Sequence, residues 1–113
     1  MCIRDSSREG YASSDAKKMG RVVNPPNEII SLDDYRKRYA TYRSDTDLQL
    51  LHQSKPMIAV WDDHEITNDT WKKGAQNHSS DEGSFYKRKN NAIKAYYESV
   101  SYTHLTLPTI CSV

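Results

Sequence analysis

The residues with the clearest chemical potential are three acids and a histidine in one short stretch. Asp62, Asp63, His64 and Glu65 follow one another directly, and Asn68 comes three residues later. Adjacent carboxylates repel each other and lose hydration when they are buried, so holding them in one place favours a bound cation. Oxygen ligands suit hard cations such as Ca²⁺, Mn²⁺ or Fe³⁺, and the imidazole could contact a phosphate or protonate a leaving group. The stretch therefore predicts a metal-centred hydrolytic site.

An apolar run precedes these residues and predicts how they are positioned. Residues 57–61, with the sequence Met-Ile-Ala-Val-Trp, read as a short buried strand that begins after Pro56. The ends of strands are where α/β sheets present their chemical groups. We therefore expect the acidic turn, defined here as residues 62–69, to lie at the edge of a sheet.

A helix is expected directly after Ser31. The serine stands three residues before Asp34, a spacing typical of a capping box, and acids in a first turn suit the helix dipole. Leucine and tyrosine side chains then recur at helical spacing, which predicts one packed face. That face consists of Leu32, Tyr35, Tyr39 and Tyr42. For these rings, core packing is favoured over a substrate-stacking platform.

Two further helices and a long loop complete the expected elements. One helix should cover about residues 47–53 with Thr46 as its cap, and the other should cover residues 84–98. Residues 71–83 contain Gly, Asn, Ser and Asp, which favour turns, and predict a loop that Trp71 anchors by burial. The basic residues of the last helix are expected to form a solvated face. They are Lys87, Arg88, Lys89 and Lys94.

Three interpretations of the acidic turn are open from the residues alone. In a purely structural one, the acids cap a helix or pair with the nearby Lys72 and Lys73. In a second, they bind calcium, but the alternating oxygen positions and the glycine of an EF-hand loop are missing. In the third, they hold a catalytic metal pair. Short acidic motifs often occur without a ligand, so the turn by itself does not decide among the three.

The two ends of the chain carry matching patterns. The codons ATG TGT ATA AGA GAC can encode residues 1–5, and their reverse complement encodes Val-Ser-Tyr-Thr-His, the sequence of residues 100–104. This inverted match resembles a transposon-end adapter from a sequencing library, so we set residues 1–6 and 99–113 aside as adapter-derived. Residues 7–98 are then expected to be an internal piece of a longer protein. Both cysteines fall outside that piece.

Composition narrows the classes of function. Of the 113 residues, 27% are charged and 36% hydrophobic, and 16 basic against 15 acidic residues give a net charge of +1. This balance argues against a dedicated nucleic-acid-binding module, so no nucleic-acid partner is expected. No apolar run is long enough to span a bilayer. With so few aliphatic residues, the piece is not expected to form a self-sufficient core.

Several short motifs share their order and spacing with a known enzyme family. They are Ser31–Tyr39 (SLDDYRKRY), Tyr42-Arg43, Asp47-Leu48-Gln49, Pro56, Val60–Glu65, Asn68-Asp69, Trp71, Phe85, Arg88-Lys89 and Ala95–Glu98. In this order they resemble the PhoD-like alkaline phosphatases, the alkaline phosphatase D family. The family's earlier Gly-Asp-x-x-Tyr motif and its later metal-binding Asp and His residues are absent from this chain.

The resemblance implies an α/β fragment: about three helices and one core strand from a calcineurin-like αββα metallophosphoesterase domain, present here incompletely. It implies a phosphatase or phosphodiesterase that hydrolyses phosphate mono- or diesters by a metal-activated hydroxide. Ca²⁺ and Fe³⁺ are the implied cofactors, with other divalent metals as alternatives. The parent protein would be periplasmic or secreted.

The resemblance also implies roles for the residues of the acidic turn. Asp63 and His64 look like the Asn-His step of the calcineurin-like motif. Asp63 would be a metal ligand, and His64 would contact phosphate or protonate the leaving group. Asn68 and Asp62, in that order, would be further ligands, and Glu65 a ligand or support. Because this is one corner of a site, the chain alone is expected to hydrolyse nothing.

A different class of function is the alternative: a non-catalytic helical interaction module, or a small metal-binding module. In the interaction module, the carboxylates would be solvated and the tyrosine face of the first helix would dock a partner. A metal-dependent nuclease is a further enzyme reading, and the near-neutral charge argues against it. Substrate identity and oligomeric state are left open by the sequence.

Overall fold

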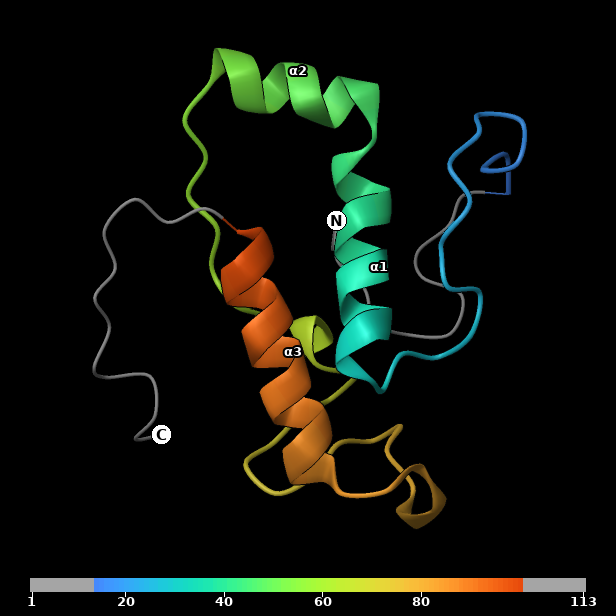
Figure 1. Ribbon diagram of the computed structural model, residues 1–113, viewed down its shortest axis with the longest axis vertical. Coiled ribbons are helices and arrows are strands. Elements are labelled where there is room, and N and C mark those ends of the chain that lie inside the picture. The colour runs from blue at the N-terminus through green and yellow to red at the C-terminus, as the bar shows by residue number, and fades with distance from the viewer. Residues whose placement is uncertain (1–13, 101–113) are drawn as a thin grey trace.

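Three helices form the frame of the structure, a computed structural model that describes residues 14–100. They are α1 (Leu32–Arg43), α2 (Thr46–Ser54) and α3 (Phe85–Ser99). α1 packs against α3, and α2 crosses the carboxyl end of α1 (Figure 1). Two single-turn 3₁₀ helices lie on the connection from α2 to α3: η1 (Asp63–Glu65) and η2 (Ser80–Glu82). The structure is thus a helical fragment, in which η1 carries the acids of interest.

α1 begins where the capping pattern predicts. The Ser31 hydroxyl accepts a hydrogen bond from the Asp34 amide (3.2 Å), and the Asp34 carboxylate accepts one from the Ser31 amide (3.0 Å). This reciprocal pair satisfies two of the amides that a helix start leaves unpaired, and it confirms the predicted capping box. The helix then buries Tyr35 and Tyr39 on the predicted face.

Two arginines of α1 fasten the helix to its neighbours. Arg38 is buried, and its Nη2 donates to the carbonyl of Pro25 (2.8 Å) in the segment before the helix. Arg36 is exposed and forms a two-pronged pair with Glu98 on α3, with N–O distances of 2.7 and 2.8 Å. The first contact holds the incoming chain, and the second joins the two packed helices at the surface.

α2 begins slightly earlier than predicted and has a different cap. The carboxylate of Asp45 accepts a hydrogen bond from the Leu48 amide (3.0 Å), so Asp45 is the N-cap and Thr46 is already helical. Aspartate is as good a cap as threonine or better, which explains the shift of one residue. Arg21 pairs with the same Asp45 carboxylate (2.5 Å) and ties the N-terminal segment to this corner.

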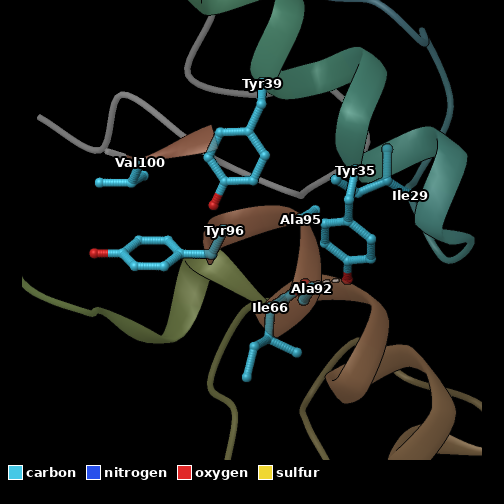
Figure 2. Packing of buried hydrophobic residues seen from close by; sticks show 8 residues of the cluster. All are labelled: Ile29, Tyr35, Tyr39, Ile66, Ala92, Ala95, Tyr96 and Val100. Carbon is cyan, nitrogen blue, oxygen red and sulfur yellow. Dashed lines mark hydrogen bonds between the residues drawn. The ribbon is translucent and has the colours of Figure 1, made fainter. Parts of the chain in front are cut away.

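A small core lies between α1, α3 and the acidic turn (Figure 2). Its buried members are Ile29, Tyr35, Tyr39, Ile66, Ala92, Ala95, Tyr96 and Val100. The two alanines on α3 leave room for the tyrosine rings of α1. Trp61 stacks on Tyr96 with ring centroids 4.2 Å apart, and this places the start of the acidic turn against α3.

The predicted strand at residues 57–61 is not formed, and residues 14–100 contain no strand. The side chains of Ile58 and Val60 are 92% and 82% exposed, whereas Ala59 and Trp61 pack on the core. A strand needs a neighbouring strand to pair its backbone amides and carbonyls. The described residues supply no such neighbour, so the segment stays extended but unpaired. The expectation of a core strand was wrong for this structure.

The loop prediction for residues 71–83 needs two corrections. The loop contains the 3₁₀ helix η2, and Trp71 does not anchor it by burial, because this residue is 55% exposed. The indole instead lies over Gly74, where an added Cβ would come within 2.8 Å of the Trp71 ring. The Trp71 amide donates to the Gly74 carbonyl (2.8 Å) and closes a short turn.

Of the two end segments, the structure describes only Ser99 and Val100. Residues 1–6 and 101–113, assigned above to adapter sequence, lie outside the described residues. Ser99 ends α3, one residue beyond the predicted end, and Val100 packs on the core. Among residues 14–100, no helix is both long and apolar enough to cross a membrane.

Candidate functional site

The backbone of the acidic turn is shaped by a capping box of its own. Asp62 is the N-cap of η1, and its Oδ1 accepts a hydrogen bond from the Asp63 amide (2.9 Å). The Glu65 carboxylate reaches back and accepts one from the Asp62 amide (2.6 Å). Glu65 is buried, unlike the exposed Asp62. Glu65 therefore supports the turn, whereas the Asp62 side chain faces solvent.

Asp63 ties the two ends of the turn together. Its carbonyl accepts hydrogen bonds from the amides of Ile66 (2.9 Å) and Thr67 (3.0 Å). Its carboxylate Oδ2 accepts one from the amide of Asp69 (2.5 Å). Asp69 has a φ of 48°, a left-handed conformation that aspartate adopts more readily than most residues. These contacts fix the backbone of Asp63 and one oxygen of its side chain.

His64 completes a three-residue group with the two aspartates. Its Nδ1 lies 2.8 Å from Oδ1 of Asp63 and 3.8 Å from Oδ2 of Asp62. Burial by itself would raise the pKa of the Asp63 carboxyl. Hydrogen bonds involving Asp62 and the Asp69 amide, together with the adjacent imidazole, instead lower this pKa below its usual value. Asp63 is therefore held as a carboxylate at neutral pH.

The three residues fit a metal ion by chemistry and by spacing. One ligand atom from each of Asp62, Asp63 and His64 lies within 4.8 Å of the other two. Two ligands of one cation lie at most about 4–5 Å apart, because each bond is roughly 2.0–2.6 Å long. Two carboxylates and an imidazole suit Ca²⁺, Mn²⁺, iron or zinc. Three donors are fewer than these cations usually take, so the group can form only part of a coordination sphere.

Asn68, the other predicted ligand, is directed elsewhere in the turn. Its side-chain amide donates to the side chain of Gln76, and its backbone carbonyl accepts from the Gln76 amide (3.2 Å). These contacts join the acidic turn to the following loop. A ligand role for Asn68 stays a prediction.

Comparison with known proteins shows the family to which this chain belongs. The family model described as PhoD-like phosphatase matches residues 3–105, which is most of the chain. The chain belongs to the PhoD-like phosphatase family. The resemblance drawn from the motifs is thereby confirmed. The matched range includes parts of both end segments assigned above to adapter sequence, and that assignment stays a prediction.

One curated relative of this PhoD-like chain is alkaline phosphatase D of Bacillus subtilis (strain 168). The two are 42% identical over 81 residues, which cover 72% of this chain and 14% of the relative. The PhoD-like chain therefore spans about one seventh of the length of the curated relative it matches. No solved structure matches it.

The PhoD-like chain also contains a buried polar network that the sequence analysis missed. Arg88, expected on a solvated face, is 1% exposed. Its guanidinium contacts polar groups from the segment before α1, from α1, from the acidic turn and from the loop before α3. These partners are Glu28, Tyr35, Thr67, Asn77, His78 and Glu82.

A signal for this network was present in the sequence. Arg88 precedes Ala92 by four residues and Ala95 by seven, the spacing that puts side chains on one helix face. The alanines are buried, so the arginine on their face is buried too. Assigning all basic residues of α3 to solvent followed their charge and ignored this periodicity.

The guanidinium of Arg88 lies between two carboxylates of this network. Arg88 Nη2 lies 2.8 Å from the Glu28 carboxylate, and Nη1 lies 3.6 Å from that of Glu82. Burial acts to lower the pKa of Arg88, but Tyr35 and Glu28 raise it, so the guanidinium stays charged. His78 adds an imidazole 3.4 Å from both Nη1 of Arg88 and the Glu82 carboxylate.

Proposed function

We propose that this chain carries one corner of the active site of a metal-dependent phosphoesterase that hydrolyses phosphate mono- or diesters. Family membership supports the phosphatase class, and the group formed by Asp62, Asp63 and His64 supports the dependence on metal. The activity is proposed for the parent protein, because the chain spans 14% of its curated relative. The remaining ligands would come from parts of the parent outside this chain.

Each residue of the group has a proposed task that follows from its geometry. Bound metal would polarise the phosphate ester and make a water nucleophile available at neutral pH. Asp63, held ionised and fixed by the Asp69 amide, is suited to be a ligand. His64 is oriented by Asp63 through Nδ1 (2.8 Å), so its ring is placed to contact phosphate or to protonate the leaving group. Asp62, being exposed, is the less constrained ligand.

Three finer features follow from the family and belong to the same proposal. The parent would have a calcineurin-like αββα core, in which residues 57–61 would pair as a strand. Its cofactors would be Ca²⁺ and Fe³⁺, which agree with the oxygen-rich donor set. The parent would be periplasmic or secreted.

The test uses the full-length parent protein with Asp63→Asn. Asparagine keeps the size of the side chain and an oxygen that can accept from the Asp69 amide, while the charge is removed. We expect hydrolysis of an aryl phosphate to fall by about 100-fold or more, with the fold retained. Asp33→Asn is the matched control, since Asp33 is an exposed acid of α1 paired with Lys37.

An active Asp63→Asn enzyme, equal to the Asp33→Asn control, would contradict the proposal and favour the interaction module. The isolated 113-residue chain gives a second check. It should show no steady turnover of the same aryl phosphate, because it offers only part of the donor set that a metal pair needs.

A further inference from the structure

Two hydrogen-bonded routes lead from Arg88 to the backbone of the acidic turn. In the first, Arg88 Nη2 donates to Thr67 Oγ1 (3.1 Å), and the Thr67 amide donates to the Asp63 carbonyl (3.0 Å). In the second, Arg88 Nε donates to the Tyr35 hydroxyl (3.3 Å), which donates to the Ile66 carbonyl (2.6 Å; Figure 2). The Ile66 amide also donates to the Asp63 carbonyl (2.9 Å). Both routes end on the backbone carbonyl of Asp63, the residue whose carboxylate is the proposed ligand.

The guanidinium is itself held rigidly by groups outside the turn. Glu28 accepts from Nη2 (2.8 Å) and the Asn77 carbonyl accepts from Nη1 (3.2 Å). The Asn77 side chain bridges two of these partners, because its Nδ2 donates to the Glu28 carboxylate (3.2 Å) and its Oδ1 accepts from the Thr67 hydroxyl (2.5 Å). The planar fork of an arginine can satisfy this many partners only in one orientation.

A purely stabilising role is a poor explanation for such a network. Burying charges costs about as much free energy as their attraction returns, so apolar side chains in place of Arg88 and its charged partners together would stabilise the helix packing as well. A fully satisfied buried network does, however, specify one local geometry. The part of the fold whose geometry it specifies here is the turn that carries Asp63 and His64.

We propose that Arg88 is a positioning residue for the metal-binding turn, acting through Tyr35 and Thr67 to fix the direction of Asp63 and His64. The inference rests on the function proposed above. It adds a part of the site that lies on α3, well separated in sequence from the acidic turn. Groups that orient metal ligands typically alter metal affinity about 10–100-fold when they are removed.

The chain contains a matched control for this idea. Arg36 also joins α1 to α3, but it is exposed, and its two-pronged pair is made with Glu98 of α3 rather than with the acidic turn. Arg36→Lys and Arg88→Lys make the same chemical change at two contacts between the same helices. Only Arg88→Lys should alter the geometry of the acidic turn.

The experiment titrates the 113-residue chain with Tb³⁺, a hard cation that accepts oxygen ligands as Ca²⁺ does. Trp61 precedes Asp62 and serves as the antenna for Tb³⁺ emission. We expect Arg88→Lys and Tyr35→Phe each to weaken binding by about tenfold. Arg36→Lys should change it by less than about twofold, as expected for an exposed pair. Tyr35→Phe serves as the second variant, because it removes one hydroxyl and is the gentler change if Arg88→Lys fails to fold.

A second readout on the same samples needs no metal. Amide hydrogen exchange at Thr67 and Asp69 should accelerate in both network variants and stay unchanged in Arg36→Lys. If the network variants match Arg36→Lys in Tb³⁺ affinity and in exchange, the positioning role is overturned. If Asp63→Asn leaves Tb³⁺ binding of the wild-type chain unchanged, the proposed metal site fails instead, and the exchange measurement alone decides the positioning.

Discussion

Asp63 has two roles that depend on different parts of the same residue. Its carbonyl and its carboxylate Oδ2 organise the turn by accepting amides of Ile66, Thr67 and Asp69. Its charge and its Oδ1, which faces His64, are what a cation would use. Substitution by asparagine separates the two roles, whereas substitution by alanine would remove both. The choice of Asp63→Asn as the test variant follows from this division.

Tyr35 makes a pH-dependent contribution that can be predicted at the same scale. Burial raises the pKa of its phenol to about 12, although the nearby Arg88 acts in the opposite direction. An unfolded tyrosine ionises near pH 10. The pKa of Tyr35 is higher in the folded chain than in the unfolded chain. The stabilisation of the fold by the neutral phenol is therefore complete below pH 10 and is lost as the pH rises from 10 to 12.

We expect this single group to lower the free energy of unfolding by about 2–3 kcal/mol across that window. Urea unfolding of the wild-type chain and of Tyr35→Phe, at steps from pH 9 to pH 12, measures the difference. The phenylalanine variant should lose less stability over the window. Parallel pH profiles for the two proteins would show that Tyr35 is not buried as described.

At the scale of single elements, helix starts give the sharpest prediction. α1 has a reciprocal capping box at Ser31, whereas Ser84 at the start of α3 makes no side-chain cap hydrogen bond. Ser31→Ala should therefore cost about 1 kcal/mol of stability, and Ser84→Ala no more than a few tenths. Thermal unfolding followed by circular dichroism compares the two variants directly. Equal losses would mean that the cap on α1 does not stabilise the helix.

Helices could be predicted from the sequence because their signals are local. The capping spacing of Ser31 with Asp34, and the tyrosines that follow at helical intervals, lie within one element. The strand at residues 57–61 could not be settled in this way, because pairing depends on partners elsewhere in a chain. The apolar composition of this segment indicates that it favours burial, but it does not show which strand would pair with it.

In the candidate site, too, local groupings could be predicted from the sequence and long-range contacts could not. Asp62, Asp63 and His64 are adjacent, so their grouping follows from the sequence itself. In the Arg88 network, Glu28 and Arg88 are 60 residues apart in the sequence, and no local sequence pattern predicts a contact over that separation. The helical spacing of Arg88 with Ala92 could have indicated burial, but it could not have named the partners.

At the scale of the whole molecule, α2 and the segment that follows it leave several apolar side chains exposed. The extended segment before the acidic turn exposes Met57, Ile58 and Val60, and α2 exposes Leu50 and Leu51. A complete soluble domain would cover such a run. The exposure agrees with a chain that spans 14% of its curated relative, and the small core between α1 and α3 reflects the same fact.

This surface leads to a prediction that compares the chain with its parent. Ile58→Lys should change the stability of the 113-residue chain by no more than about 0.5 kcal/mol, because Ile58 is 92% exposed. In the full-length parent, where residues 57–61 are proposed to form a buried strand, the same charge should strongly destabilise the fold. Gln53→Lys, at an exposed position of α2, is the control in both proteins.

Chemical unfolding of Ile58→Lys and Gln53→Lys, each made in the 113-residue chain and in the parent and compared with its own wild type, measures the difference in stability. A large loss for Ile58→Lys in the parent, beside none in the chain, supports the proposed strand. Equal, small effects in both would show that the segment stays unpaired in the parent as well.

We propose that the acidic turn holds metal in a PhoD-like phosphoesterase. The most direct measurement is a crystal structure of the full-length parent with anomalous data collected at the iron edge and below it. We expect a metal peak with an Asp63 carboxylate oxygen within about 2.0–2.6 Å, and with His64 beside it. Metal peaks found only away from this turn, with Asp63 still bonded to the Asp69 amide, would contradict it.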